Sequence, residues 1–195
     1  GENGGCVLVS ADDPGMHSSQ NEQDNRHYAM AAKLPMLEPA DSQEAKDFTK
    51  LAFELSERFD TPVLLRVTTR ICHSKSLVGL EDRQEKPAIP YERNIPKYVA
   101  TPANGKVLRK KLIQRLADLR SYSEKAPVNV AEYNGTAVGV VAAGVAYQYA
   151  REVFGPDASY LKLGLPYPMS IPEMDELNTA LLRQAVFGSE PTVLS

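Results

Sequence analysis

The segment from Asp41 to Thr69 constrains the fold more than any other part of the chain, because it joins a clear helix to a clear strand. Asp41 at a helix N-cap, with Glu44 three residues later, forms a capping box. Apolar residues then recur at three- and four-residue spacing, which predicts that one helix face packs on a sheet. They are Ala45, Phe48, Ala52, Leu55 and Phe59. The residues at 60–62, Asp-Thr-Pro, end the helix, and the run Val-Leu-Leu-Arg-Val-Thr-Thr at 63–69 predicts a buried strand.

Two shorter apolar runs upstream complete the same unit. The run Cys-Val-Leu-Val at 6–9 is short and precedes Asp-Asp-Pro-Gly at 12–15, which predicts a buried strand that ends in a loop. A second short strand is expected at 35–37. A short helix at 25–32 is expected between them, with Arg26, His27 and Tyr28 on its surface. The order strand, loop, strand, helix, strand is typical of an α/β sandwich with a largely parallel sheet.

The loop at 11–24 is dense in polar side chains. Residues 17–21 are His-Ser-Ser-Gln-Asn, and carboxylates lie on both sides of them. In open α/β sheets ligands bind outside the carboxyl ends of the strands. Polar groups are also costly to bury without partners. The loop is therefore either a solvated, self-capping turn or a ligand-facing loop, and the residue types alone leave both interpretations open.

Further candidates follow the strand at 63–69. Arg70 and His73 come after its end, so they lie on the same side as His17 if the two strands are parallel. Arg66 interrupts the apolar strand itself and must be paired or must reach the sheet edge. For Arg66 we expect an ion pair with a carboxylate of the Asp12 loop in preference to a direct substrate contact. The candidate site residues are His17, Ser18, Ser19, Gln20, Asn21, Arg70 and His73.

The second half of the chain predicts a connection and a further α/β unit. From 74 to 102 periodicity disappears and prolines alternate with charges, so an extended connection is expected. A helix follows at 106–125, and its basic faces indicate either solvent or contact with a partner subunit. Strands are then expected at 138–142 and 159–163 around a helix at 146–154. Gly144 permits the turn before that helix; such a glycine can also cradle a phosphate, but the turn requires it in any case.

Composition excludes several classes of function. The formal net charge of −3 gives no reason to expect a nucleic-acid partner, and no segment approaches the apolar length of a membrane span. Cys6 and Cys72 form no Cys-x-x-Cys pair, which indicates a reducing cytoplasm and argues against an iron-sulfur cassette within these residues. The three histidines have no metal-ligand spacing, so no metal site is expected.

The polar loop also carries a resemblance. The stretch at 10–24 reads Ser-Ala-Asp-Asp-Pro-Gly-Met-His-Ser-Ser-Gln-Asn-Glu-Gln-Asp, with Asn-Gly-Gly at 3–5 before it and Leu-Glu-Pro at 37–39 after it. It resembles the alpha subunit of indolepyruvate:ferredoxin oxidoreductase, one of the thiamine-diphosphate-dependent 2-oxoacid:ferredoxin oxidoreductases. The resemblance continues through the residues at 62–70 and 73–74 and reappears at 144–149 and 161–168. It covers roughly the middle of such a subunit.

The resemblance implies an enzyme that oxidatively decarboxylates arylpyruvates such as indolepyruvate to aryl-acetyl-CoA. It implies coenzyme A as a co-substrate, ferredoxin as electron acceptor and a beta subunit as partner. It also implies thiamine diphosphate with Mg²⁺ and [4Fe-4S] clusters in the full-length protein. The family's activating glutamate, Gly-Asp-Gly motif and cluster cassette lie outside these residues, so we expect the isolated chain to be inactive. Loop 11–24 would form one wall of the substrate cavity, with His17 either a donor to the substrate or a structural residue.

The implied fold class is α/β, with two incomplete three-layer units that have largely parallel sheets. Residues 1–75 would be the C-terminal half of a pyrimidine-binding-type domain, 76–126 a Pro-rich connection and basic helix, and 127–195 a transketolase C-terminal-like domain. A helix is expected at 175–187 where the family has another strand. Either residues are missing between Met174 and Asp175, or this second domain is shortened.

Two classes of function therefore remain. The chain is part of a catalytic oxidoreductase subunit, or it is a non-catalytic α/β assembly or binding module. Within the first class, the same loop would also serve another 2-oxoacid such as pyruvate.

Overall fold

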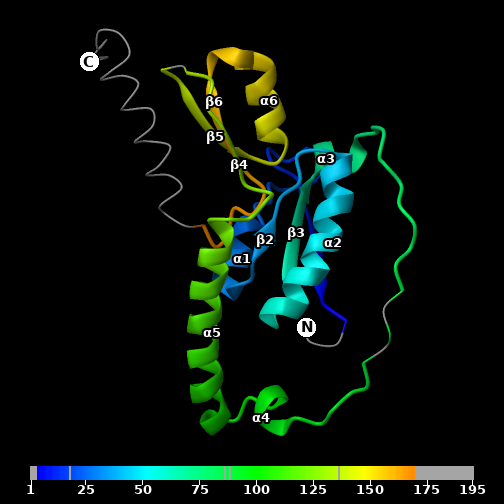
Figure 1. Ribbon diagram of the computed structural model, residues 1–195, viewed down its shortest axis with the longest axis vertical. Helices are drawn as coiled ribbons and strands as arrows, with labels where there is room; N and C mark the ends of the chain where they lie inside the picture. The colour runs from blue at the N-terminus through cyan, green and yellow to red at the C-terminus, as the bar shows by residue number, and fades with distance from the viewer. Residues whose placement is uncertain (1–3, 18, 86, 88, 136, 170–195) are drawn as a thin grey trace.

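The computed structural model describes residues 4–17, 19–85, 87, 89–135 and 137–169, and it contains two small sheets with helices packed around them (Figure 1). Both sheets are mostly parallel and open, so the predicted α/β class is confirmed. The helix expected at 175–187 and the question of missing residues after Met174 lie outside the described residues.

The first sheet contains strands β1 (Val7–Asp12), β3 (Val63–Thr68) and β2 (Met36–Leu37) in the order β1-β3-β2, all parallel. Helix α1 (Arg26–Ala32) lies between β1 and β2 in the chain. β1 ends three residues later than predicted, because it pairs with β3 as far as Asp12, which lies opposite Thr68. The loop after β1 is therefore loop 13–24. The prediction that this strand is buried is wrong, because β1 lies at the edge of the sheet and Leu8 and Val9 are exposed.

Helix α2 (Ser42–Phe59) begins and ends where the sequence indicates. The carboxylate of Asp41 accepts the backbone N–H of Glu44 at 2.8 Å, and Glu44 in turn accepts the backbone N–H of Ala40 at 2.8 Å. At the other end Asp60 adopts a left-handed conformation with φ 48°, and its N–H donates to the last carbonyls of the helix. The predicted apolar face is confirmed, with Phe48, Ala52 and Leu55 buried.

A long connection follows β3 (Figure 1). The short helix α3 (Thr69–His73) comes directly after the strand, and the described residues from 74 to 94 contain no regular element. Helix α4 (Ile95–Tyr98) then precedes the long helix α5 (Pro102–Ser123). α5 begins four residues earlier than predicted, because Thr101 caps the N–H of Asn104 and proline is tolerated in the first turn of a helix.

The second sheet has the order β4-β6-β5. β5 (Gly139–Ala143) and β6 (Ser159–Leu163) are parallel, as predicted, and they are joined by helix α6 (Val145–Phe154) and a short 3₁₀ turn, η1 (Gly155–Asp157). β4 (Val130–Glu132) pairs with β6 in the antiparallel direction. The sequence did not indicate β4, because three residues are too few for a periodic pattern.

One hydrophobic core joins the first sheet to the segments that flank the second, while Leu161 and Leu163 of β6 form a cluster of their own. Leu37, Phe48 and Leu65 of the first unit belong to the same buried cluster as Ala126 and Leu165. The backbone N–H of Met36 donates to the carbonyl of Tyr167 at 2.8 Å, so the chain after β6 extends the edge of the first sheet. These contacts connect the two halves of the chain, and the domain boundaries stay a prediction.

Replacing Phe48 tests this shared core. Phe48 is 4% exposed, and its ring would lie 2.9 Å from a Cβ placed at Gly164. We expect Phe48→Ala to lower the free energy of unfolding by about 3–5 kcal/mol in a single urea transition followed by circular dichroism. The matched control is Phe53→Ala on the same helix, where the side chain is 45% exposed and the expected loss is about 1 kcal/mol or less. Two separate transitions, or equal losses in the two variants, would contradict a shared core.

Candidate functional site

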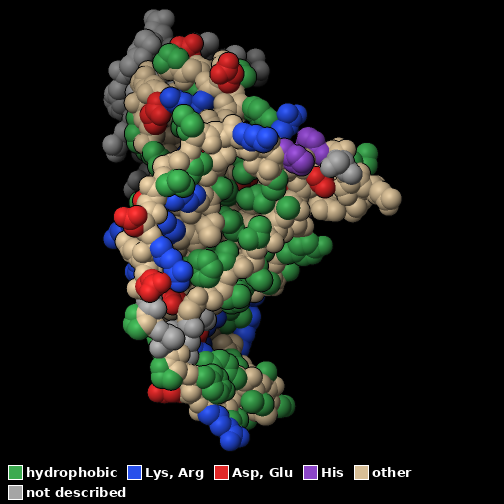
Figure 2. Space-filling view, turned by 90° about the vertical axis from the view of Figure 1, so that its right-hand side faces the viewer, with side chains coloured by type: hydrophobic (Ala, Val, Ile, Leu, Met, Phe, Trp, Pro, Cys, Tyr) green, Lys and Arg blue, Asp and Glu red, His purple; other side chains and the backbone are tan. Residues whose placement is uncertain are grey.

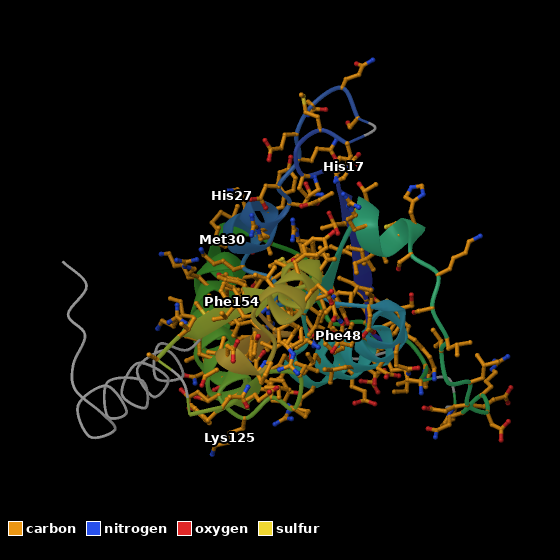
Figure 3. All side chains as sticks on the ribbon, turned by 90° about the horizontal axis from the view of Figure 1, so that it is seen from above. His17, His27, Met30, Phe48, Lys125 and Phe154 are labelled. Carbon is orange, nitrogen blue, oxygen red and sulfur yellow. The ribbon has the colours of Figure 1, made fainter. Side chains whose placement is uncertain are left out.

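The carboxyl edge of the first sheet carries the candidate residues. β1 and β3 are parallel and in register up to Asp12 and Thr68, so loop 13–24 and helix α3 leave the sheet side by side. The sequence predicted that His17, Arg70 and His73 lie at one edge if the two strands are parallel, and the strands are parallel. Figure 3 shows His17 beyond the end of β1, whereas His27 lies apart on α1.

Arg66 lies buried beneath this edge and is paired with two carboxylates. Its Nε donates to Asp12 Oδ2 at 2.7 Å, and its Nη1 donates to Glu38 Oε1 at 2.5 Å. The side chains are 4%, 0% and 8% exposed for Arg66, Asp12 and Glu38. The expected pairing with Asp12 is confirmed. Glu38 was not foreseen, although it directly follows β2, where Leu37 lies opposite Leu65 and so brings the next residue beside Arg66.

The two carboxylates give the buried network one more negative than positive charge. Burial raises the pKa of Glu38 above its usual value, and the nearby guanidinium groups of Arg66 and Arg26 only partly oppose this shift. An acid with a raised pKa in the folded state costs stability when it ionises, so its contribution is most favourable at low pH and is lost as pH rises through the folded pKa.

Hydrogen bonds hold the two ends of loop 13–24 together and tie its start to α3. Asp12 Oδ2 also accepts the backbone N–H of Asn25 at 2.8 Å, so one carboxylate joins the residues on either side of the loop. The hydroxyl of Thr69 contacts the side chain of Asp13 and lies 3.1 Å from the carbonyl of Asp12. The sequence signal for these contacts is weak, because each joins residues far apart in the chain.

The tip of the loop is mostly exposed. Met16 and His17 have positive φ angles of 68° and 29°, and the N–H of Ser19 donates to the carbonyl of Met16 at 2.7 Å. His17, Gln20 and Asn21 are exposed, while Ser19 is half-buried and its hydroxyl accepts from Gln23 Nε2 at 3.4 Å. The loop thus combines internal hydrogen bonds with free polar groups. Ser18 lies outside the described residues.

The candidates form an open edge, and the described cavity lies elsewhere. Arg70 and His73 are exposed on α3. A cavity of about 900 Å³ lies between α2 and the extended segment at 81–89, lined by residues such as Lys46, Phe53 and Ile89. Figure 2 views the molecule from the side of this segment, where hydrophobic side chains gather. The sequence did not indicate this cavity, and none of the six candidates that the structure describes lines it.

The described residues do not fit the metal and cofactor groups that the resemblance implies. Within the described part of the chain, no three His, Cys, Asp or Glu side chains lie together in a way that would hold a metal ion. The sequence has no Gly-Asp-Gly motif and two cysteines, whereas a [4Fe-4S] cluster uses four. No described helix is both long and apolar enough to cross a membrane.

Comparison with known proteins gives a consistent result. No protein-family model matches the chain. Indolepyruvate oxidoreductase subunit IorA of Methanothermobacter thermautotrophicus is 42% identical over 193 residues, which cover 95% of this chain and 31% of the relative. The proteins of the same name from Archaeoglobus fulgidus and Pyrococcus abyssi are 43% and 38% identical, over 85% and 99% of this chain and 26% and 32% of the relatives. The predicted resemblance is confirmed, and the chain spans less than a third of the length of these relatives.

Asp24, near the end of loop 13–24, provides a test of the electrostatics. Arg26 donates to both of its carboxylate oxygens, at 2.8 and 2.7 Å, and these hydrogen bonds lower the pKa of Asp24 to about 2. We expect Arg26→Gln to raise this pKa toward the ordinary value of 3.8, measured by NMR titration of the carboxyl carbon. The pair is partly exposed, so it should stabilise the fold by about 1 kcal/mol at most, a contribution present above pH ~4 and lost as pH falls toward 2.

The matched control is His27→Gln. The Nε2 of His27 lies 3.8 Å from the same carboxylate, and the His27 side chain is 73% exposed. This change should therefore leave the pKa of Asp24 near its starting value. An unchanged pKa in Arg26→Gln would contradict the assignment.

Proposed function

We propose that the chain forms part of the alpha subunit of an indolepyruvate oxidoreductase, and that loop 13–24 borders the 2-oxoacid site of the complete enzyme. The observation that carries this proposal is the parallel register of β1 and β3, which puts the polar loop and helix α3 at one sheet edge. Relatives at 37–43% identity that are named indolepyruvate oxidoreductase subunit IorA support an oxidoreductase. Carboxyl edges of such sheets are where ligands bind in α/β proteins.

The chemistry of a 2-oxoacid suggests a role for each candidate. Its carboxylate would pair with the exposed guanidinium of Arg70 or with the imidazole of His73. The oxygen of the 2-oxo group gains negative charge as the carbonyl is attacked, and His17 would donate a hydrogen bond to it. Ser18, Ser19, Gln20 and Asn21 would orient the substrate. We propose the arylpyruvate class because the relatives' name specifies indolepyruvate; pyruvate is the alternative that the same loop would accept.

The remaining chemistry would belong to other parts of the protein. We propose that thiamine diphosphate with Mg²⁺, the [4Fe-4S] clusters and coenzyme A are bound by portions of a longer protein. The subunit designation in the relatives' names supports a beta subunit as partner, and ferredoxin would accept the electrons in the cytoplasm. The chain described here would supply one wall of the site and the structure that holds it.

The second candidate function is an assembly module. β1 is an edge strand of the first sheet, and Leu8 and Val9 on it are 44% and 68% exposed. An exposed apolar edge of this kind favours pairing with another strand or subunit. In that case the candidate residues would be surface groups without a role in turnover.

Replacing His17 in the complete enzyme separates the two functions. If His17 acts on charge that grows in the transition state, His17→Ala should lower turnover by roughly ten- to a thousandfold with little loss of stability. The control is His27→Ala, because His27 is 73% exposed on α1 and should change turnover by less than about twofold. The measurement is indolepyruvate-dependent reduction of a viologen dye under anaerobic conditions, together with thermal unfolding of the same preparation.

Two outcomes would count against the enzymatic role of the loop. One is a loss of about 1–3 kcal/mol of stability in His17→Ala with turnover per folded molecule intact, as for a structural hydrogen bond. The other is an equal effect on turnover at both positions.

A further inference from the structure

We infer that Gly144, in the turn between β5 and α6, positions loop 13–24 and does so through the buried side chains of Glu38, Arg66 and Asp12. Gly144 follows β5 of the second sheet and the loop follows β1 of the first, so the inference joins two parts of the chain that are distant in sequence. It does not depend on which reaction the complete protein catalyses.

The first link is the close contact between Gly144 and Glu38. A Cβ placed on Gly144 would lie 2.6 Å from Glu38 Oε1 and 2.9 Å from its Cγ, which is too close for any side chain. Glu38 has little room to retreat, because it is buried, its backbone N–H donates to Gly164 at 3.0 Å, and its carboxylate is held by Arg66. The absence of a side chain at Gly144 therefore leaves the space in which the Glu38 carboxylate binds Arg66.

The second link is the guanidinium of Arg66. This group is planar and rigid, and its Nη1 and Nε bind Glu38 and Asp12 at the same time. A displacement of the Glu38 carboxylate must turn the guanidinium or break one of its two bonds. Either response disturbs the 2.7 Å bond to Asp12 Oδ2.

The third link is the carboxylate of Asp12. The same Oδ2 atom accepts the N–H of Asn25, so it closes the ends of loop 13–24. Among the described residues, Asp12 Oδ1, Glu38 Oε2 and Thr68 Oγ1 are buried without a hydrogen-bond partner. Two of these three atoms are carboxylate oxygens that already lack a donor, so breaking a further bond of Arg66 is costly, and a loss at one end of the network is expected to reach the other.

The chain supplies a matched control for the glycine. Gly144 and Gly155 lie at the two ends of α6, with φ and ψ of 55° and −145° at the first and 51° and −129° at the second. Both conformations are strained for an L side chain. A Cβ at Gly155, however, would meet no atom within 4 Å. The two alanine variants thus share the backbone strain and differ in the contact with Glu38.

Hydrogen exchange of the 195-residue chain, read by mass spectrometry, tests the inference. We expect Gly144→Ala to raise exchange at residues 13–25 by about tenfold or more, and Gly155→Ala to change it there by less than about twofold. In a Glu38→Ala background the clash is absent, so adding Gly144→Ala should raise exchange in the loop by less than about twofold further.

Two results would overturn the inference. One is an equal effect of the two glycine variants on the loop, and the other is an undiminished effect of Gly144→Ala when Glu38 is alanine. If Gly144→Ala does not fold, Glu38→Asp tests the second and third links, because a side chain shorter by one methylene draws the carboxylate away from Arg66. Exchange in the loop should then rise, and unchanged exchange there would overturn the inference.

Discussion

The burial of Arg66 between two carboxylates is the interaction on which the rest of the structure depends. A guanidinium does not lose its charge in a protein, so a strand that carries one into the interior requires anionic partners. One partner, Asp12, ends β1, and the other, Glu38, follows β2, so the pairing joins all three strands of the first sheet. Gly144 packs directly against Glu38, so the turn that follows β5 of the second sheet contacts the same network.

Such a network is a costly way to fill a core, since apolar residues of similar volume often stabilise a protein as well or better. Its contribution here is to hold loop 13–24 in position. The carboxylate of Asp12 pairs with Arg66 on one side and closes loop 13–24 on the other. Burial raises the pKa of Glu38, and the negative charge of Asp12 adds a smaller effect in the same direction. The network thus connects the exposed edge where we place the 2-oxoacid to the interior of the first sheet.

The sequence predicted the features that depend on local patterns. The capping box at Asp41, the buried strand around Arg66 and the parallel strands that bring His17 and Arg70 to one edge all follow from spacing and residue type. The pairing of Arg66 with Asp12 followed from the cost of an unpaired buried charge. The contact between Arg66 and Glu38 was not predicted, because it depends on the pairing of β3 with β2, a strand of two residues. The core that joins the first sheet to the residues around Ala126 and Leu165 was not predicted either, because it depends on packing across a connection of some thirty residues that has little periodicity of its own. Exposure of the loop likewise cannot be read from residue types alone.

The most direct measurement of the central claim is the stability of Arg66→Met beside a variant in which all three charges are removed. We expect Arg66→Met to lower the free energy of urea unfolding by about 3–5 kcal/mol, because it leaves two buried carboxylates without their cation. Adding Asp12→Asn and Glu38→Gln should recover most of this loss. A cost below about 1 kcal/mol for Arg66→Met, or no recovery in the triple variant, would show that the fold does not depend on this ion network.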